Sequence, residues 1–407
     1  MNLVLEQRSR RHFPRTCRKT SFSAILCVAR ICDVTLTRTH DARAANEDLS
    51  HHLPNGKGFV NPWDSFREPA NSSFGMLGKI LMARWNRKTD PQASTEEGIP
   101  KLRPVDFEAL AKSSANANGM ALTWLGHAAF LLTLPGANIL LDPCLSDRCS
   151  PVSFAGPKRL VQTPPNVKLD ELKLDAVVVS HNHYDHLDLP IMQNLHKNNP
   201  DIIFFVPLGN KSLLTDVGIT NVVECDWWDS YKISKPKTTA TNWFGKSDNS
   251  VEITCTPCQH FSSRTAWDRN QTLWSSWHIA TPQKSFFFGG DTGYRSVFEG
   301  DNEDSVPTCP AFRQVKARFG PCDLAAIPIG AYEPRLLFSP IHCNPKDACD
   351  VHVDLGSKKS VGMHWGTFGL GFEGPREPPG VLREELKKRG IKDTDFVIVD
   401  IGETVEV

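Results

Sequence analysis

Short apolar runs recur along the chain from Ala121 onward, and each is bounded by polar residues or by glycine. Runs of this length that are rich in Val, Ile and Phe are typical of buried β-strands. The pattern predicts strands at residues 121–125, 129–133, 138–141, 176–179, 202–206, 251–254, 285–288, 324–329, 360–363 and 396–399. Helical patterns between them predict helices at 188–196, 209–217, 345–354 and 380–389. Strands interleaved with helices indicate layered sheets with helices on the outside.

Residues 1–55 differ from this pattern in their charge. Before residue 33 the only acidic side chain is Glu6, and Ser and Cys are interspersed among basic residues. The basic residues are Arg8, Arg10, Arg11, Arg15, Arg18, Lys19 and Arg30. This composition is typical of a transit peptide, and equally of a disordered basic extension that could approach anionic lipid. We therefore predict a separate extension, disordered or targeting, over residues 1–55.

A second segment, residues 56–104, contains a helical pattern followed by a polar linker. Its apolar residues Phe74, Leu77, Leu81 and Trp85 recur at spacings of three and four, which places them on one face of a helix. Basic residues surround this face, namely Lys79, Arg84, Arg87 and Lys88. Such a helix packs on its own domain or lies on a membrane surface. We predict that residues 105–407 beyond the linker form a single domain.

Composition argues against several classes of protein. The 46 basic and 46 acidic residues balance, so no overall field favours a nucleic-acid partner. No run of about 18 apolar residues occurs, so a membrane-spanning helix is not predicted. The 12 cysteines are scattered, and a chain of 407 residues does not need disulfides to fold, which indicates reduced intracellular thiols. Cys255 and Cys258 have the spacing of a redox or zinc motif, although packing in a loop explains them better.

The strongest chemical signal follows the predicted strand at 176–179. His181, His183, Asp185 and His186 lie within one hexapeptide. His181 and His183 alternate in register and can face one ion, whereas Asp185 and His186 lie one turn further on and can face a second. Imidazole and carboxylate ligands suit zinc or a similar divalent cation. A solvated histidine-rich turn is the alternative, but the H-x-H-x-D-H spacing favours metal binding.

Three further candidate ligands, His260, Asp291 and His364, each follow an apolar run at or near its end. Strand ends that converge on one rim would bring them to the first cluster. His181, His183 and His260 can then hold one metal ion. Asp185, His186 and His364 can hold a second ion, and the carboxylate of Asp291 can bridge the two. Two ions about 3.5–4 Å apart lower the pKa of a water between them, which provides a nucleophile for hydrolysis.

Longer motifs resemble one family of enzymes. They are Thr123-Trp-Leu-Gly-His-Ala128, Leu141-Asp-Pro143, Gly156-Pro-Lys-Arg159, Ser180-His-Asn-His-Tyr-Asp-His-Leu-Asp188, Asp226-Trp-Trp228, Phe287-Phe-Gly-Gly-Asp-Thr-Gly-Tyr294, Asp323-Leu-Ala-Ala-Ile-Pro-Ile-Gly-Ala-Tyr-Glu-Pro-Arg335 and His364-Trp-Gly-Thr-Phe368. With Phe59-Val-Asn-Pro-Trp63, they resemble the N-acylphosphatidylethanolamine-hydrolysing phospholipase D family of the metallo-β-lactamase superfamily. The resemblance covers residues 58–403, and the run at 323–335 is its most specific part.

The resemblance implies an α/β fold, the four-layer αβ/βα sandwich of the superfamily, with a dinuclear metal site at one edge of the sheets. It implies a zinc-dependent phosphodiesterase that hydrolyses N-acylphosphatidylethanolamine to N-acylethanolamine and phosphatidic acid. The seven candidate ligands match family positions, with two Zn²⁺ or similar cations as cofactors. His342 matches a further family histidine, and we expect His342 and Asp291 to be catalytic.

Substrate contacts are expected from Arg264, Trp227, Trp228 and Tyr184. Because a lipid with long chains does not leave a bilayer readily, the expected partners are a membrane phospholipid and a membrane surface, without nucleic acid. This reasoning favours the 74–88 face as membrane-facing, and a homodimer stays open. We expect an intracellular protein peripheral to an endomembrane such as the Golgi or endosome, with a mitochondrial location through the basic N-terminus as the alternative.

Two other functions stay open at this stage. The chain could be a different hydrolase of the superfamily, such as a lactonase or a soluble phosphodiesterase, or a binding protein that has lost its metals. The second is disfavoured because every ligand position is filled. Residues 299–310 resemble an acidic insertion, which we expect to be solvent-exposed or to shape the mouth of the site, and residues 230–250 are longer and more polar than the family pattern.

Overall fold

The computed structural model describes residues 28–31, 34–45, 47–68, 99–235 and 250–407. The helix predicted at 74–88 and the first 27 residues of the basic segment lie outside these ranges. In the described part of the chain, no helix has the length and apolar character needed to cross a membrane.

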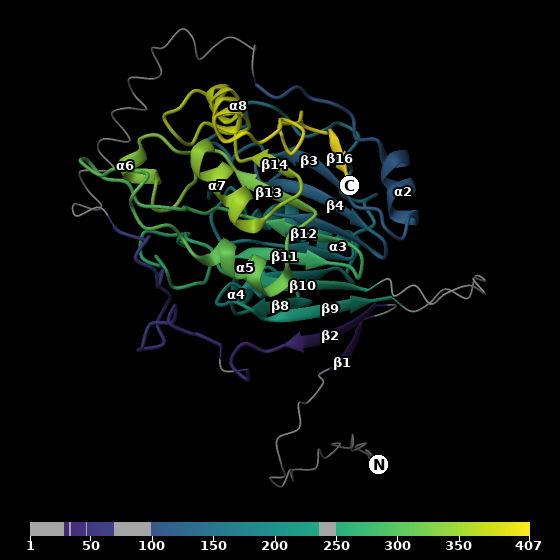
Figure 1. Cartoon of the computed structure of the whole chain (residues 1–407). Helices are drawn as coiled ribbons and strands as arrows, with labels where there is room; N and C mark the ends of the chain where they lie inside the picture. The colour runs from purple at the N-terminus through teal and green to yellow at the C-terminus, as the bar shows by residue number, and fades with distance from the viewer. Residues whose placement is uncertain (1–27, 32–33, 46, 69–98, 236–249) are drawn as a thin grey trace, which may run out of the picture.

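The described strands form two mixed sheets (Figure 1). The nine-stranded sheet contains, in spatial order, β1 (Val28–Ile31), β2 (Val34–His40), β9 (Ser230–Ser234), β10 (Val251–Thr256), β11 (Ser276–Ala280), β12 (Ser285–Phe288), β13 (Leu324–Pro328), β14 (Ser360–Met363) and β15 (Phe396–Val397). The seven-stranded sheet contains β16 (Thr404–Glu406), β3 (Ala121–Gly126), β4 (Ala129–Leu134), β5 (Ala137–Leu141), β6 (Ala176–Val178), β7 (Ile203–Pro207) and β8 (Val222–Cys225).

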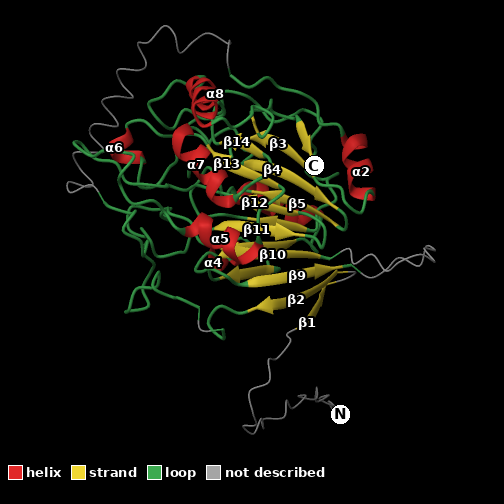
Figure 2. Cartoon of the chain, viewed as in Figure 1, coloured by secondary structure: helices red, strands yellow, loops and turns green. Residues whose placement is uncertain are grey.

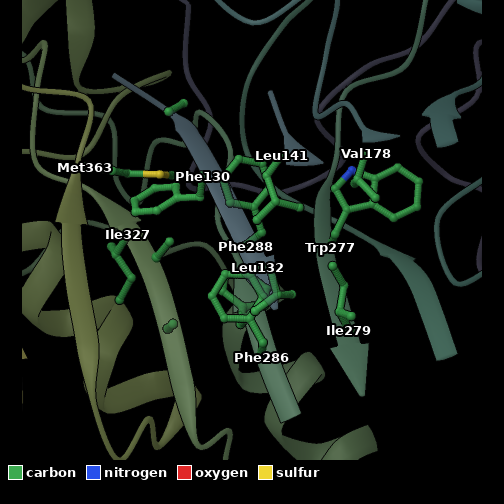
Figure 3. Packing of buried hydrophobic residues seen from close by; sticks show 14 of the residues in the cluster. Phe130, Leu132, Leu141, Val178, Trp277, Ile279, Phe286, Phe288, Ile327 and Met363 are labelled. Atoms are coloured by element: carbon green, nitrogen blue, oxygen red, sulfur yellow. The ribbon is translucent and has the colours of Figure 1, made fainter. Parts of the chain in front are cut away.

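The two sheets pack face to face through a large apolar core. Alternation along β4 shows the arrangement, because Phe130 and Leu132 enter this core whereas Leu131 enters a second core on the opposite face. From the nine-stranded sheet, Phe286 and Phe288 of β12 meet the side chains of β4 and β5 (Figure 3). Burial of both faces of both sheets explains why their strands read as continuous apolar runs.

Helices cover the outer faces of both sheets (Figure 2). The second core joins the seven-stranded sheet to α2 (Phe107–Ala115), α3 (Leu189–Asn198) and α4 (Lys211–Thr215). The main core includes residues of α5 (Ala311–Phe319), α7 (Pro345–Leu355) and α8 (Glu377–Arg389) on the other side, and a short helix, α6 (Arg335–Phe338), precedes α7. The order helix, sheet, sheet, helix is the predicted four-layer αβ/βα sandwich, which is confirmed.

Each of the ten predicted strands corresponds to an observed strand, as do the four predicted helices. The structure adds β1, β2, β8, β9, β11, β16, α2, α5 and α6, which the apolar pattern did not predict. The predicted ends are accurate to within about three residues, with α8 beginning earlier than expected.

The folded part of the chain begins before the boundary predicted at residue 55. Strand β2 pairs antiparallel with β9, and Thr35 lies opposite Ser234. The carboxylate of Asp229 accepts hydrogen bonds from the backbone of Ala42 and pairs with Arg38. The segment after β2 is therefore fixed to the sandwich, and of the predicted extension residues 1–27, 32–33 and 46 lie outside the described structure.

Candidate metal centre

The predicted ligands lie at one edge of the sandwich, because the strands that precede them end there. In the seven-stranded sheet, β5 and β6 are parallel, so the residues that follow them emerge on the same side. In the nine-stranded sheet, β12, β13 and β14 are parallel, and Asp291 and His364 follow two of these strands. Both sheets therefore contribute side chains to one rim.

The first cluster contains His181, His183, His260 and Asp291. His181 Nε2 lies 2.7 Å from His183 Nδ1, and His183 Nδ1 lies 3.3 Å from His260 Nε2. The Oδ2 atom of Asp291 lies 3.8 Å from the Nε2 atoms of both His181 and His260. These are the three histidines that the sequence assigned to one ion, together with the carboxylate assigned to bridge.

The second cluster contains Asp185, His186 and His364, which the sequence grouped, and also His127. Asp185 Oδ2 lies 3.5 Å from both His186 Nε2 and His364 Nε2, and 2.9 Å from His127 Nε2. Asp291 reaches this cluster as well, because its two oxygens each lie 3.1 Å from one ring, that of His186 or that of His364. Asp291 thus lies between the two clusters.

The sequence analysis did not assign His127 a role, although its position has the signal used for the other ligands. His127 follows the strand β3 directly, as His364 follows β14. Its ring stacks obliquely on that of His364, with 3.9 Å between centroids, and burial lowers its pKa to about 3. A neutral His127 can bind a cation or orient Asp185 with an N–H donor.

Hydrogen bonds on the far ring nitrogens fix how three histidines face the rim. The Nδ1 atom of His186 lies 2.6 Å from the carboxylate of Asp142. His260 Nδ1 lies 2.7 Å from the carbonyl oxygen of Ile341, and His181 Nδ1 lies 2.9 Å from the hydroxyl of Ser180. When Nδ1 carries the proton, Nε2 presents a lone pair, which is the form that binds metal. Asp188, at the end of the ligand loop, caps the N-terminus of α3.

The histidines of the rim differ in protonation. Burial lowers the pKa of His181 and His260 well below the usual value, so both rings are neutral. Burial opposes the charged form of His364 too, but the carboxylates of Asp291 and Asp185 outweigh it and raise that pKa to about 9. The pKa of His186 is raised in the same way. The protons on His186 and His364 supply positive charge that bound cations would otherwise supply, and metal binding would release these protons.

The donor set fits divalent cations. Among the described residues, His186 Nε2, His364 Nε2 and Asp291 Oδ1 are buried without a well-aligned hydrogen bond, although each ring lies 3.1 Å from an oxygen of Asp291. Buried polar atoms without partners are uncommon and call for a missing ligand. Nitrogen and carboxylate donors at this density suit zinc and similar ions. The first cluster and the group Asp185, His186 and His364 would hold them, with Asp291 common to both.

The backbone at the rim adopts conformations that side chains rarely take. Three residues have positive φ here, namely His127 at 56°, Asp142 at 36° and His364 at 63°. Gly290, directly before Asp291, has a φ of 55°, and a Cβ atom there would lie 2.5 Å from the Cβ of Ser180. Strain of this kind is tolerated where surrounding structure imposes it, and it is common at functional sites.

An N-terminal strap, residues 41–45 and 47–68, also reaches the centre. The side chain of Asn61 donates to the carbonyl oxygen of His260 over 2.7 Å and accepts from the His260 N–H over 3.2 Å. Ser65 donates to the side chain of Gln259, 2.6 Å away. The other end of the strap is held by buried Asp226, whose oxygens lie 2.8 Å from His51 Nε2 and from His52 Nε2. No sequence signal identified these contacts.

Of the predicted substrate residues, Tyr184 is part of the ligand loop and Arg264 lies beside it. The Arg264 guanidinium donates to the carbonyl oxygens of Asn182 and Leu187 and lies 4.0 Å from the ring centroid of Tyr184. Arg264 therefore braces the loop that carries His183 and Asp185. Its contact with substrate stays a prediction.

The two predicted tryptophans lie elsewhere. Trp227 is buried between His51 and Trp63, and its indole N–H donates to the carbonyl oxygen of Trp274. Trp228 is half-buried beneath the guanidinium of Arg318. These residues belong to the region where the strap docks, so nothing places them against the ligand clusters.

His342 lies at the rim, and its catalytic role stays a prediction. Its Nε2 atom is 3.8 Å from Asp291 Oδ2, and its ring centroid is 5.2 Å from those of His260 and His364. Burial lowers its pKa to about 4, so the ring is neutral at neutral pH. One ring nitrogen, Nδ1, is buried without a partner, which leaves His342 free to turn a donor or an acceptor toward a ligand.

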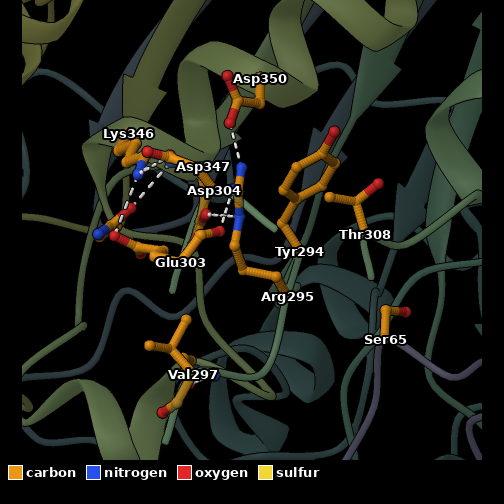
Figure 4. Close-up of polar contacts among 12 residues, drawn as sticks. Ser65, Tyr294, Arg295, Val297, Glu303, Asp304, Thr308, Lys346, Asp347 and Asp350 are labelled. Atoms are coloured by element: carbon orange, nitrogen blue, oxygen red, sulfur yellow. Dashed lines mark hydrogen bonds and ion pairs between the residues drawn. The ribbon is translucent and has the colours of Figure 1, made fainter. Parts of the chain in front are cut away.

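The insertion at 299–310 is not simply solvent-exposed. Glu303 pairs with Arg335 over 2.7 Å and with Lys346 over 3.2 Å, and its carbonyl oxygen accepts from Arg295 (Figure 4). Arg295 is buried and also pairs with Asp347 over 2.8 Å and with Asp350. The insertion is thereby joined to α6 and α7, which flank the loop that carries His342.

Comparisons with known proteins agree with this geometry. A family model described as "Beta-lactamase superfamily domain" matches residues 137–365. N-acyl-phosphatidylethanolamine-hydrolyzing phospholipase D 1 of Caenorhabditis elegans is 35% identical over 381 residues, which cover 92% of this chain and 99% of that protein. The mitochondrial N-acyl-phosphatidylethanolamine-hydrolyzing phospholipase D of Saccharomyces cerevisiae is 34% identical over 287 residues, covering 69% of this chain and 55% of that protein.

Among solved structures, the isothiocyanate hydrolase from Delia radicum gut bacteria superposes with a TM-score of 0.50 at 20% identity. The match covers 70% of this chain and 98% of that one. At this identity it supports the fold alone.

Proposed function

Because the chain belongs to the beta-lactamase superfamily and, within it, to the N-acyl-phosphatidylethanolamine-hydrolysing phospholipase D family, we propose that it hydrolyses N-acylphosphatidylethanolamine to N-acylethanolamine and phosphatidic acid. The observation that carries this proposal is the position of Asp291. Its carboxylate lies within 3.8 Å of ring nitrogens of five histidines, namely His181, His186, His260, His342 and His364.

We propose two Zn²⁺ or similar divalent ions as cofactors, held by His181, His183 and His260 and by Asp185, His186 and His364, with Asp291 shared. When bound, such ions lower the pKa of a water and offset the negative charge that develops on phosphate oxygens. The chain's own residues set the arrangement. Asp142 orients the ring of His186, and the carbonyl oxygen of Ile341 orients the ring of His260. Arg264 fixes the loop that carries His183 and Asp185.

Hydrolysis joins a water oxygen to phosphorus and breaks the bond between phosphorus and the ethanolamine oxygen, which leaves with a proton from that water. We assign Asp291 and His342 to this step. Asp291 supplies negative charge between the two clusters, and its pKa is held well below the usual range by the surrounding histidines despite burial. His342, neutral at the rim, donates a hydrogen bond that positions the phosphate.

The partners and location that we propose follow from the substrate. A phospholipid with long acyl chains costs about 0.8 kcal/mol per exposed CH₂ to withdraw from a bilayer, so the enzyme acts at a membrane surface. We propose a peripheral protein on an intracellular membrane. The yeast relative is named as mitochondrial, which supports the mitochondrial alternative over the Golgi or endosome.

The substrate is tested with vesicles that contain N-acylphosphatidylethanolamine. Metal-loaded protein is expected to release phosphatidic acid and N-acylethanolamine, detected by mass analysis, and a chelator should stop the release. Hydrolysis of a soluble phosphodiester or a lactone without any release from vesicles would refute the proposed substrate. Metal analysis of the purified protein tests the identity and number of the ions.

Replacing Asp291 by Asn keeps the size of the side chain but removes its charge. We expect the Asp291→Asn variant to lose bound metal and to hydrolyse the lipid at least about a hundredfold more slowly, because the shared ligand is gone. The matched control is Asp393→Asn, since Asp393 is exposed and precedes β15, at the opposite end of the parallel strands β14 and β15 from His364. An unchanged metal content and rate in Asp291→Asn would rule out the shared carboxylate.

A further inference from the structure

Two aromatic side chains stand out by their exposure among the described residues. Trp267 is 87% exposed and Phe154 is 82% exposed. Other exposed large apolar residues range from 38% to 53%. Single exposed apolar residues are common on protein surfaces, so exposure alone does not mark a binding site, and the position of the two loops decides what they can bind.

Both side chains lie on ordered loops. Around Trp267, the Oδ1 atom of Asp268 accepts from the backbone N–H groups of Arg264 and Thr265, over 3.0 and 2.8 Å. Around Phe154, Arg148 and Lys158 form an antiparallel bridge, and the Arg148 guanidinium donates to the Gly156 carbonyl oxygen over 2.6 Å. The second loop is therefore a short hairpin with Phe154 near its tip.

The two loops flank the same part of the metal centre. The Trp267 loop reaches it through Arg264, which lies on the ring of Tyr184. The hairpin reaches it through Cys149, which is buried in a small cluster with Cys144 and Phe368 against which Tyr184 packs. Tyr184 lies between His183 and Asp185, so both loops are anchored at the segment that supplies ligands to both clusters.

We propose that Phe154 and Trp267 enter the surface of a lipid bilayer and hold the metal centre against it. This inference rests on the proposed function, which places the scissile bond in the headgroup layer of a membrane. Tryptophan suits that layer, because its ring is apolar and its indole N–H finds polar partners among the headgroups. The exposed Val152 and Lys158 beside Phe154 fit the same surface, the first in the apolar region and the second beside lipid phosphate.

The test uses full-length, metal-loaded protein and vesicles of phosphatidylcholine without substrate. We expect Phe154→Ser and Trp267→Ser each to weaken vesicle binding by about tenfold, which is the loss from exposing one such side chain, and the double variant to weaken it further. The matched control is Phe107→Ser. Phe107 is 38% exposed on α2. In Figure 1, α2 lies on the opposite side of the molecule from α6, the helix that precedes the His342 loop of the rim. Equal vesicle binding by the double variant and the parent would overturn the proposal.

A second measurement reports on insertion itself. Brominated phosphatidylcholine quenches the fluorescence of tryptophan that enters the bilayer. The Trp267→Phe variant should bind vesicles like the parent and lose most of the quenching that the parent shows. Quenching that persists unchanged in this variant would show that Trp267 stays out of the bilayer.

Other occupants of these loops have distinct outcomes. If the double variant loses self-association, measured by light scattering, while vesicle binding is unchanged, the loops join two copies of the chain and the proposal fails. Because the vesicles contain no substrate, the result does not depend on hydrolysis. A parent protein that binds vesicles through these residues yet releases no product would contradict the proposed function but support the membrane-binding surface.

Discussion

Buried histidines serve two different ends in this protein. Those at the rim face carboxylates and one another, and they fit cations. His278 in β11 has no such neighbours among its described contacts, since its ring lies flat on Phe319 with 4.1 Å between centroids. Burial alone lowers the pKa of His278 to about 4. A ring that must stay neutral in the folded protein makes stability depend on pH.

This dependence has a definite direction. The unfolded imidazole takes up a proton below a pH of about 6.5, whereas the folded one does so only near pH 4, so stability falls as the pH drops between these values. At pH 5 the loss attributable to His278 is about 2 kcal/mol. The variant His278→Phe should therefore lose less stability than the parent between pH 7 and pH 5, measured by chemical unfolding in chelator. Parallel losses in the two proteins would contradict this assignment.

The seven predicted ligands could be found from sequence because they follow apolar runs that end at one edge of the sheets. His127 has the same layout after β3, but a single histidine without a neighbouring ligand carries little weight alone. Asn61 lies in the motif Phe59-Val-Asn-Pro-Trp63, but its role at His260 could not be predicted. Its contacts with the His260 backbone depend on how residues 199 positions apart come together, which no local pattern records.

At the scale of elements, the strap makes the position of a ligand depend on a distant segment. His260 lies beyond the end of β10, and its backbone N–H and carbonyl oxygen are both held by Asn61. The strap in turn is held by the contacts of His51 and His52 with Asp226. Asn61 is thus a positioning residue for His260.

We expect Asn61→Ala to weaken metal binding by about ten- to a hundredfold, because neighbours that orient metal ligands typically contribute this much. Competition with a chelator of known affinity measures the change directly. Asn55→Ala is the matched control, since Asn55 lies in the same strap and only accepts from the Lys57 N–H. Wild-type affinity in Asn61→Ala would show that the strap does not position His260.

The elements that the sequence failed to predict share a physical feature. Strand β9 reads Ser-Tyr-Lys-Ile-Ser, and β11 reads Ser-Trp-His-Ile-Ala, so neither is a continuous apolar run. Their backbone hydrogen bonds come from pairing with β10, and the pairing imposes the strand. Local sequence propensity is enough to form the apolar strands, whereas β9 and β11 are strands because of their position in the sheet.

At the scale of the whole molecule, both sheets supply ligands. His181 and Asp185 follow the seven-stranded sheet, whereas His260, Asp291 and His364 follow the nine-stranded sheet. Cations held by this set would link the two halves of the sandwich. Metal binding would then stabilise the fold, since a ligand that binds only the native state shifts the unfolding equilibrium.

Removal of the metal should therefore lower the melting temperature. At a free metal concentration about a thousand times the Kd, the stabilisation is about 4 kcal/mol, which we expect to appear as a fall of roughly 5 °C in Tm when chelator is added. The Asp291→Asn variant should respond much less to chelator. A parent Tm that does not move on complete metal removal would show that the cations do not link the sheets.

The pairing of β2 with β9 has a consequence for biosynthesis. A ribosome delivers β2 long before its partner, with Thr35 and Ser234 separated by almost half of the polypeptide. Strand β2 can pair with β1 at once, but its other edge stays unpaired until β9 emerges. Such delayed long-range contacts slow folding and favour binding by chaperones. His364 emerges later still. Cations can therefore be loaded fully only once translation is nearly finished.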